Sequence, residues 1–557
     1  MLPIAEVTPE HLLIAPLLIP FVAGVLMLFY DDRRRWLKFG LGLASVVMLA
    51  IVSWNLLDRA GEDALLRVYM LGNWPVPMGI VLALDRLSAL MVMLTATLAL
   101  PALIFAAAGS QGQGQHFHSL FQFLLVGLNG AFLTGDLFNL FVFFEVMLAA
   151  SYGLVLHGSG VMRIRAGLHY IAINLTASLL FLIGVALIYG VTGTLNMAQI
   201  GLIVPRLSPE ARPLFHAGAA ILGVAFLVKA AMWPMGFWLA RTYAAATPPV
   251  GAMMTLMSKV GVYAILRLAM MCFSPGAGES AGFGAPVLLI GGMLTMAYGA
   301  LGVLSSDRLA LRAGHIVLIS SGTLISVMGI ALLAGGDRLL GGALFYMVGS
   351  TLAVSSLYLI AEIVDRRAPQ AKDDDREPEP EKEIDWGPMG LGAVDDDEEP
   401  ATALPASLVT VGALFAAVTV ILAGLPPFSG FIGKFAMISG AIAETNQGGP
   451  PPAVVWAFVA LLLVSGFSVL LALLKFGIAR FWVATEDPPR ILALEVVPVV
   501  MLLAVLVMLS FRAEPAMRLS LRAADSLLER RYAATVMSVR PVDPGAQPEI
   551  ERRDDAP

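Results

Sequence analysis

The sequence predicts an all-α polytopic membrane protein, on the grounds of its composition and its long apolar runs. Its 557 residues are 58% hydrophobic and 14% charged, with a mean hydropathy of +0.81, whereas soluble domains carry about 25% charged residues. Because one bilayer crossing takes about 20 apolar residues, the runs predict about fourteen transmembrane helices. They lie near 12–29, 37–57, 80–108, 117–134, 137–157, 166–190, 216–240, 247–273, 284–304, 310–334, 340–363, 404–443, 452–479 and 491–511.

Several classes of protein are excluded at this level. The first apolar run has no basic flank or small-residue cleavage site, so we expect a retained helix and not a signal peptide. Cys272 is the only cysteine, which excludes disulfides, iron–sulfur clusters and cysteine zinc sites. No Walker loop or metal-binding spacing occurs, so we expect no cofactor and no metal. The net charge of −6 comes largely from one acidic loop and indicates no nucleic-acid partner.

Basic residues in the short loops predict the orientation. These basic residues all fall on one side of the predicted bundle, and that side should face the cytoplasm. Both termini are therefore expected on the outer side of the membrane. A basic tail after residue 511 would then lie outside, which long tails tolerate. The residues are Arg33, Arg34, Arg35, Lys38, Arg163, Arg165, Arg241, Arg308, Arg312, Arg366, Arg367, Arg480 and Arg490.

Two further segments differ from the helices. Residues 365–400 are strongly acidic and cannot bury apolar area, so we expect a disordered cytoplasmic loop, either a spacer or a docking surface for a partner. The tail from 515 to 535 places apolar side chains on one face at helical spacing, which favours an amphipathic helix lying along the membrane surface. That face holds Met517, Leu521, Ala524, Leu528 and Tyr532.

Two of the predicted helices are interrupted. Pro234 follows Lys229 by five residues, and a segment rich in Gly and Pro, 424–433, comes just before Lys434. Paired broken helices in corresponding positions of two halves are typical of inverted repeats with an ion site near the bilayer midplane. Each break here contains a lysine.

Charged residues inside apolar helices are the candidate functional residues, because a charge near the bilayer centre costs about 2.5–3.5 kcal/mol on insertion scales. Glu145 lies about 13 Å along its helix from Asp136 at the 1.5 Å rise per residue, so Asp136 would lie near the outer surface and Glu145 well inside. A lone buried carboxylate would be protonated, and Lys229 is the natural partner for an ion pair. That pair is either structural or functional.

Lys259 and Lys434 extend the row. Lysine is the basic side chain whose pKa moves readily on burial, so a row of lysines favours a proton relay. Other cations lie toward segment ends, where long side chains reach the headgroups, and we expect that of Arg86, Arg267, Lys475 and Arg480.

His315 opens the apolar run 315–333. It is either a structural hydrogen-bonding residue or a proton-transfer group. Downstream, Ser320, Ser321 and Thr323 could hydrogen-bond waters or neighbouring helices inside the membrane.

The chain resembles the antiporter-like family that complex I membrane subunits share with Mrp-type multisubunit cation/proton antiporters, and within it the D subunit of Mrp systems. The matching stretches are 135–145 (GDLFNLFVFFE), 229–239 (KAAMWPMGFWL), 248–267 (PPVGAMMTLMSKVGVYAILR) and 424–434 (GLPPFSGFIGK).

The resemblance implies a fourteen-helix fold with two inverted five-helix repeats, in which helices seven and twelve are broken. The implied divisions are three helices in 1–116, a first repeat in 117–273, a second in 284–480 that includes the acidic loop, and a last helix with its tail in 490–557. One departure concerns residues 346–356, where family members often carry a histidine and this chain has Gly349 and Ser350.

The resemblance also implies roles for residues. Glu145 and Lys229 match the family's ion pair, while Lys259, His315 and Lys434 match members of a hydrated axis along which protons move. Because the histidine of helix eleven is missing, a relay must pass from Lys259 through His315 to Lys434 with help from water or hydroxyl groups.

The first functional hypothesis is a proton-translocating subunit of a Na⁺ or K⁺/H⁺ antiporter, driven by the proton-motive force in a bacterial inner membrane. Its partners would be the lipid bilayer and other membrane subunits. A second hypothesis is the proton-pumping membrane subunit of a complex I-like or hydrogenase-type oxidoreductase. A third is a scaffold whose charges only hold helices together.

Overall fold

The computed structural model describes residues 11–62, 67–365, 405–445, 450–481, 491–528 and 531–540. The predicted acidic loop lies outside these residues apart from Asp365, the last residue of α13. The first part holds α1 (Ala15–Leu28), α2 (Arg35–Glu62), β1 (Arg67–Met70), β2 (Val81–Leu84), α3 (Arg86–Ala107), α4 (Phe117–Leu133), α5 (Leu137–Val155), α6 (Val161–Thr192), α7 (Met197–Ile203), α8 (Arg212–Lys229), α9 (Leu239–Ala245) and α10 (Pro248–Phe273). The second part holds α11 (Ala285–Ser305), α12 (Leu309–Ala334), α13 (Asp337–Asp365), α14 (Ala406–Ala423), α15 (Ser429–Thr445), α16 (Pro452–Phe481), α17 (Ala493–Phe511), α18 (Ala513–Leu528) and α19 (Arg531–Ser538).

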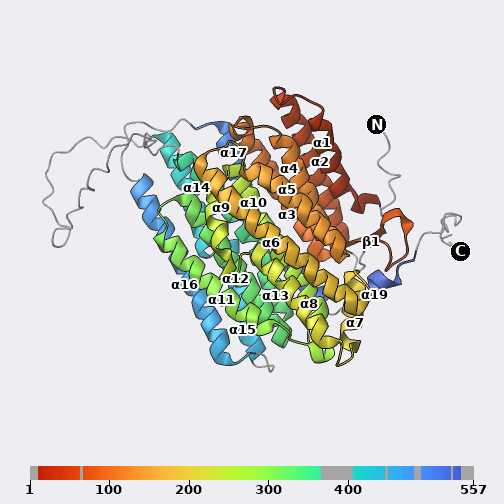
Figure 1. Cartoon of the computed structure of the whole chain (residues 1–557). Coiled ribbons are helices and arrows are strands. Elements are labelled where there is room, and N and C mark those ends of the chain that lie inside the picture. Colours follow the sequence, from red (N-terminus) through yellow and green to blue (C-terminus); the bar gives the residue numbers. More distant parts are fainter. Residues whose placement is uncertain are drawn as a thin grey trace, which may run out of the picture.

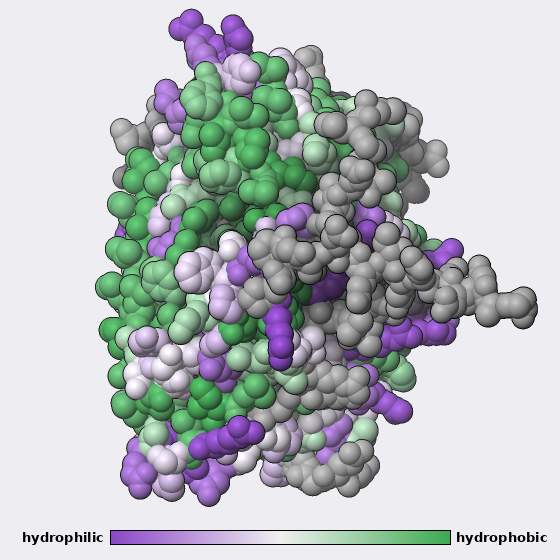
Figure 2. Space-filling model, turned by 90° about the vertical axis from the view of Figure 1, so that its right-hand side faces the viewer, coloured by the Kyte–Doolittle hydropathy of each residue, from purple (hydrophilic) through white to green (hydrophobic). Residues whose placement is uncertain are grey.

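The helices of the described part have the length and composition of membrane spans. Twelve of them are long and apolar enough to cross a bilayer, and α1 and α4 are shorter apolar helices. Large apolar side chains such as Phe21, Leu179 and Phe467 are exposed on the outside, and Figure 2 shows extensive apolar areas on one face of the molecule. An all-helical polytopic membrane protein is therefore confirmed.

Three helices form the core. The apolar windows of α10, α12 and α13 are each 94% buried, whereas those of α2 and α17 are 33% buried. In Figure 1 these three helices run through the middle of the bundle. A helix that is apolar all round is typical of such a position, and polar side chains on these helices are consequently shielded from lipid.

Both predicted interruptions are confirmed. The helix α8 ends at Lys229, and the chain passes Pro234, which has no N–H to continue a helical ladder, before α9 begins. The helix α14 ends at Ala423, followed by Gly424 at φ +80°, a left-handed conformation that glycine adopts without a steric penalty. The next helix starts at Ser429. Each break therefore leaves a helix end inside the bundle.

The start of the predicted helix 80–108 is a β-hairpin instead. Residues 81–84 form β2, which pairs antiparallel with β1 so that Met70 faces Val81. The helix α3 begins only at Arg86, because Asp85 caps it by accepting a 2.8 Å hydrogen bond from the N–H of Ser88. A short apolar run cannot be assigned to strand or helix from its periodicity alone, which is why the hairpin was not predicted.

The predicted amphipathic tail helix exists as α18, although Tyr532 of the predicted face lies in α19; its position along the membrane surface stays a prediction. Its apolar face packs against α13, α3 and α10, where Ala523, Ala524 and Leu527 are buried. A Cβ atom on Gly341 of α13 would lie 2.6 Å from the Leu521 side chain, so glycine permits this close approach. The following helix, α19, contacts α7. The tail is thus part of the folded protein and covers one end of the bundle.

Candidate functional site: a row of buried lysines

The row begins on α5 with Glu145. Its carboxylate accepts a hydrogen bond from the Ser178 hydroxyl of α6, and the side chain is half-buried. Asp136 lies at the start of the same helix, where its carboxylate caps the N-terminus by accepting a 2.8 Å hydrogen bond from the N–H of Asn139. The structure therefore gives Asp136 a helix-capping contact and separates it from Glu145 along the helix.

Lys229 is the last residue of α8 and only 4% exposed. Its ammonium nitrogen has no hydrogen-bond partner among the described residues and lies 4.9 Å from the centroid of the Phe144 ring, over which a cation is attracted. Glu145 acts on it electrostatically but is not among the contact ion pairs of the described residues. The predicted partners are thus neighbours whose direct contact is not formed in this structure.

Lys259 lies in the middle of α10 and is 1% exposed. Its ammonium donates to two hydroxyls of α12, to Ser320 Oγ at 3.0 Å and to Ser321 Oγ at 3.2 Å. These contacts confirm the expectation that the two serines hydrogen-bond a neighbouring helix. Ser320 Oγ lies 2.9 Å from Ser350 Oγ on α13. Lys259 is therefore solvated by neutral hydroxyls.

Lys434 lies on α15, just beyond the second break, and is 8% exposed. Its ammonium donates to the carbonyl oxygen of Ala423 at 2.9 Å, an acceptor at the end of α14. Glycines on two sides give the ammonium its space, because a Cβ atom on Gly424 or Gly466 would lie 2.9 or 2.8 Å from the nitrogen. No carboxylate of the described residues lies within ion-pair distance of Lys434 or Lys259.

A small cavity of about 10 Å³ lies beside both Ser350 and Lys434. Ser350 and Tyr346 line it from α13, Lys434 and Gly430 line it from α15, and Gly466 lines it from α16. This volume is about the minimum that one water molecule needs. Polar atoms of the wall provide the hydrogen-bond partners that a buried water requires.

His315 is not brought together with the lysines. Its Nδ1 donates to the carbonyl oxygen of Leu311 at 2.9 Å and lies 3.3 Å from Ser306 Oγ. Its ring packs on α11, where a Cβ atom on Gly302 would lie 2.0 Å from it. These contacts place His315 between α11 and α12, whereas the serines of α12 connect α10 with α13.

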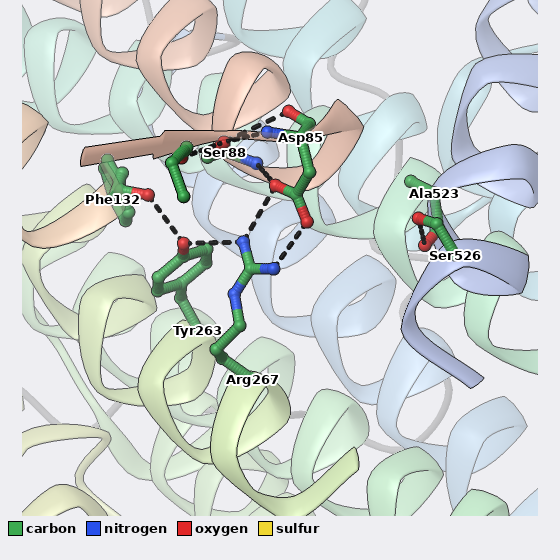
Figure 3. A network of polar contacts seen from close by, with 8 residues as sticks. Asp85, Ser88, Phe132, Tyr263, Arg267, Ala523 and Ser526 are labelled. Atoms are coloured by element: carbon green, nitrogen blue, oxygen red, sulfur yellow. Dashed lines mark hydrogen bonds and ion pairs between the residues drawn. The ribbon is translucent and has the colours of Figure 1, made fainter. Parts of the chain in front are cut away.

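Arg267 is a buried residue whose position the sequence prediction missed. It is 4% exposed, and its guanidinium donates to both carboxylate oxygens of Asp85, one of them at 2.8 Å. It also donates to the Tyr263 hydroxyl at 2.9 Å (Figure 3) and lies 4.7 Å from the ring centroid of Tyr532 in α19. The expectation that Arg267 reaches the headgroups is therefore wrong, because a bidentate carboxylate holds it inside.

The pKa of Asp85 reflects its pairing with Arg267. Burial on its own raises the pKa of Asp85, but the Arg267 guanidinium outweighs burial, and this pKa lies below its ordinary value. No sequence signal links the two residues, because they are 182 positions apart. The other cations with the same expectation differ from it: Lys475 is exposed, and Arg86 and Arg480 donate to backbone carbonyls of Ala60 and Val364.

Metal binding finds no support in the described part of the chain. No three His, Cys, Asp or Glu side chains of these residues are grouped as a metal site requires. What the row offers chemically is a set of groups that exchange protons: one carboxylate, three amines and the hydroxyls between two of them.

The comparisons with known proteins agree on one family. A family profile described as "NADH:quinone oxidoreductase/Mrp antiporter, TM" matches residues 134–376. The chain is 49% identical to the probable D subunit of a K⁺/H⁺ antiporter from Rhizobium meliloti (strain 1021), covering 93% of this chain and 96% of that one. It is 33% identical to the D subunit of a Na⁺/H⁺ antiporter from Alkalihalophilus pseudofirmus, covering 93% and 98%. A chain of the Mrp complex from Dietzia sp. DQ12-45-1b superposes with a TM-score of 0.79 at 25% identity, covering 95% and 100%.

Proposed function

Because this chain belongs to the D subunits of Mrp-type multisubunit cation/proton antiporters, we propose that it moves protons along its row of buried lysines in exchange for Na⁺ or K⁺. It is a transporter subunit and not an enzyme. The observation that carries the proposal is the environment of Lys259 and Lys434, whose buried ammonium groups donate, within the described part of the chain, only to uncharged oxygens.

The physical reason is the cost of a buried charge. An ammonium without a counter-ion in a dry interior is unstable relative to its neutral amine, so each lysine can release and regain a proton at modest cost. Lysine, unlike arginine, titrates readily when buried. Protonation of Lys229 and its association with Glu145 would alternate, and the change of field would act on Lys259 and then on Lys434.

The proposal also includes the repeat structure of the fold. We propose about fourteen helices with two inverted five-helix repeats, 117–273 and 284–480. In each repeat the fourth predicted helix is the broken one. The broken helices are α8 with α9 and α14 with α15. Residues 1–116 and 490–557 would flank the repeats. Both ends of the chain would face outward across a bacterial inner membrane, on the basic-loop argument.

The surface around Glu145 supports a partner. Glu145 is half-buried on α5 between Phe138 and Val142, which are 48% and 41% exposed, and Ala149, which is also exposed. A carboxylate left against lipid at this depth is costly. We expect another membrane subunit of the complex to cover this face. The oxidoreductase alternative is set aside, because relatives that match over 93% of the chain are antiporter subunits.

The direct test is to replace Glu145 or Lys229 by Ala in the assembled complex and to measure cation-dependent dissipation of a pH gradient in everted vesicles. We expect antiport to be abolished while the complex still assembles, because each change removes one member of the initiating pair. Lys475→Ala is the matched control, since Lys475 is exposed, and should retain activity. Wild-type antiport in the Glu145 and Lys229 variants would refute the proposal.

A further inference from the structure

Two of the buried lysines are separated by a pair of core helices. Lys259 on α10 faces α12, and Lys434 on α15 packs near α13. The helices α12 and α13 lie against each other between them. Both helices also contact α10 and α15, so groups on α12 and α13 are placed to carry a proton from one lysine to the other.

The geometry points to Ser320 and Ser350 as the proton-transfer residues that join Lys259 to Lys434, with one water in the cavity beside Lys434; this inference rests on the proposed function. Ser320 Oγ accepts from Lys259 at 3.0 Å and lies 2.9 Å from Ser350 Oγ. Ser350 in turn lines the cavity that Lys434 also lines. The chain of contacts thus runs from amine to amine.

Each group in this chain has the chemistry that the step needs. A serine hydroxyl donates one hydrogen bond and accepts others. The Lys259 N–H bond breaks as its proton goes to Ser320 Oγ, while the proton of Ser320 passes to Ser350 Oγ and that of Ser350 to the water. The water gives one of its protons to the neutral amine of Lys434, where a new N–H bond forms. Every hydroxyl ends with one proton, and the positive charge has moved between lysines.

The chain contains its own controls. Ser321 also accepts from Lys259, at 3.2 Å, but its hydroxyl has no other hydrogen bond among the described contacts. Ser356 is a buried serine of α13 whose hydroxyl donates to the carbonyl oxygen of Leu352 in its own helix. Tyr346 provides the competing route, because it contacts Ser320 and lines the same cavity.

The experiment compares alanine variants of these serines in the complete antiporter complex. Turnover per assembled complex is measured in everted vesicles over a range of cation concentrations. Ser320→Ala and Ser350→Ala should each lower kcat by about a hundredfold, the size of effect for loss of one positioned proton-transfer group, and leave the cation KM unchanged. Ser356→Ala should stay within about twofold of wild type, and Ser321→Ala should lower kcat by clearly less than Ser320→Ala. Normalising to assembled complex separates turnover from folding.

Three results would overturn the inference. Equal losses in the Ser320 and Ser321 variants would mean that the serines only solvate Lys259. Wild-type turnover in Ser350→Ala would remove it from the path, as would a loss in Tyr346→Phe that exceeds the loss in Ser350→Ala. If the Glu145 and Lys229 variants are inactive while both Ser320 and Ser350 variants are active, only this inference fails. Active Glu145 and Lys229 variants would instead refute the proposed function.

Discussion

Two cations of α10, Lys259 and Arg267, are equally buried and differently surrounded. They lie about 12 Å apart along one helix at 1.5 Å per residue. Among the residues that the structure describes, Lys259 donates only to hydroxyls of α12. Arg267 has a bidentate carboxylate from Asp85 and the ring of Tyr532 beneath its guanidinium. Burial is therefore the same, and the compensation of charge is what differs.

The different surroundings of Arg267 and Lys259 distinguish a charge that stabilises the fold from a charge that can titrate. A buried ion pair with all its hydrogen bonds made keeps one protonation state, and removing either partner leaves a stranded charge. A buried ammonium among neutral hydroxyls can lose its proton without leaving another buried charge unpaired. Arg267 therefore holds α10 to the start of α3, whereas Lys259 has the surroundings of the proton carrier that we propose it to be.

The largest effect should come from Arg267→Met. The change leaves the Asp85 carboxylate buried without its cation, which costs about 3–5 kcal/mol, so we expect little assembled complex. The measurement is the amount of folded chain recovered from membranes in mild detergent.

The matched variant is Lys259→Met, at the other cation of α10. Its hydroxyl partners are neutral, so the complex should assemble and be inactive. Normal assembly of Arg267→Met, or failure of Lys259→Met to assemble, would break the distinction between the two cations.

A smaller effect concerns acid stability. The pKa of Asp85 is lower in the folded protein than its ordinary value, so its contribution to stability is present above the unfolded pKa of about 3.9. That contribution is lost as the pH falls through the folded pKa. Thermal unfolding of the detergent-solubilised complex between about pH 6 and pH 3 should show this loss.

The Asp85→Asn variant supplies the comparison. It cannot titrate at this position, so it should be less stable near neutral pH and should lose less stability on acidification than the wild type. Parallel acid profiles for the two proteins would contradict the assigned role of the ion pair.

The smallest effect should come from Tyr532→Leu. Loss of the ring beneath the Arg267 guanidinium should destabilise the complex by about 1 kcal/mol, within the range for cation–π contacts, and thermal unfolding of the solubilised complex would detect it. Tyr532→Phe keeps the ring and should match the wild type. If the Phe variant falls as far as the Leu variant, the contact is not a ring contact.

The sequence was sufficient for features whose signal is local. Long apolar runs predicted the helices, and Gly and Pro next to Lys229 and Lys434 predicted both breaks. Hydroxyls inside an apolar run identified Ser320, Ser321 and Thr323 as hydrogen-bonding residues, of which Thr323 donates to the carbonyl of Ile319 in its own helix. In each case the residues that carry the signal are neighbours in the chain.

Features that depend on distant contacts were missed. The ion pair of Asp85 with Arg267 joins residues 182 positions apart, and the snorkelling rule that was applied to Arg267 sees only its distance from the helix end. The packing of α18 depends on α13 and α3, which no pattern in the tail can reveal. For His315 the sequence left a structural role and proton transfer open, and its orientation toward α11 depends on packing against Gly302.

The docking of the tail has a consequence for how the protein is made. Chains emerge from the ribosome with the N-terminus first, so α3 and α10 are inserted while residues beyond 512 are still being synthesised. The ring of Tyr532 reaches Arg267 only after the last helices have left the ribosome. Until then the end of the bundle that α18 and α19 cover is open. Completion of the core is in this way tied to completion of translation.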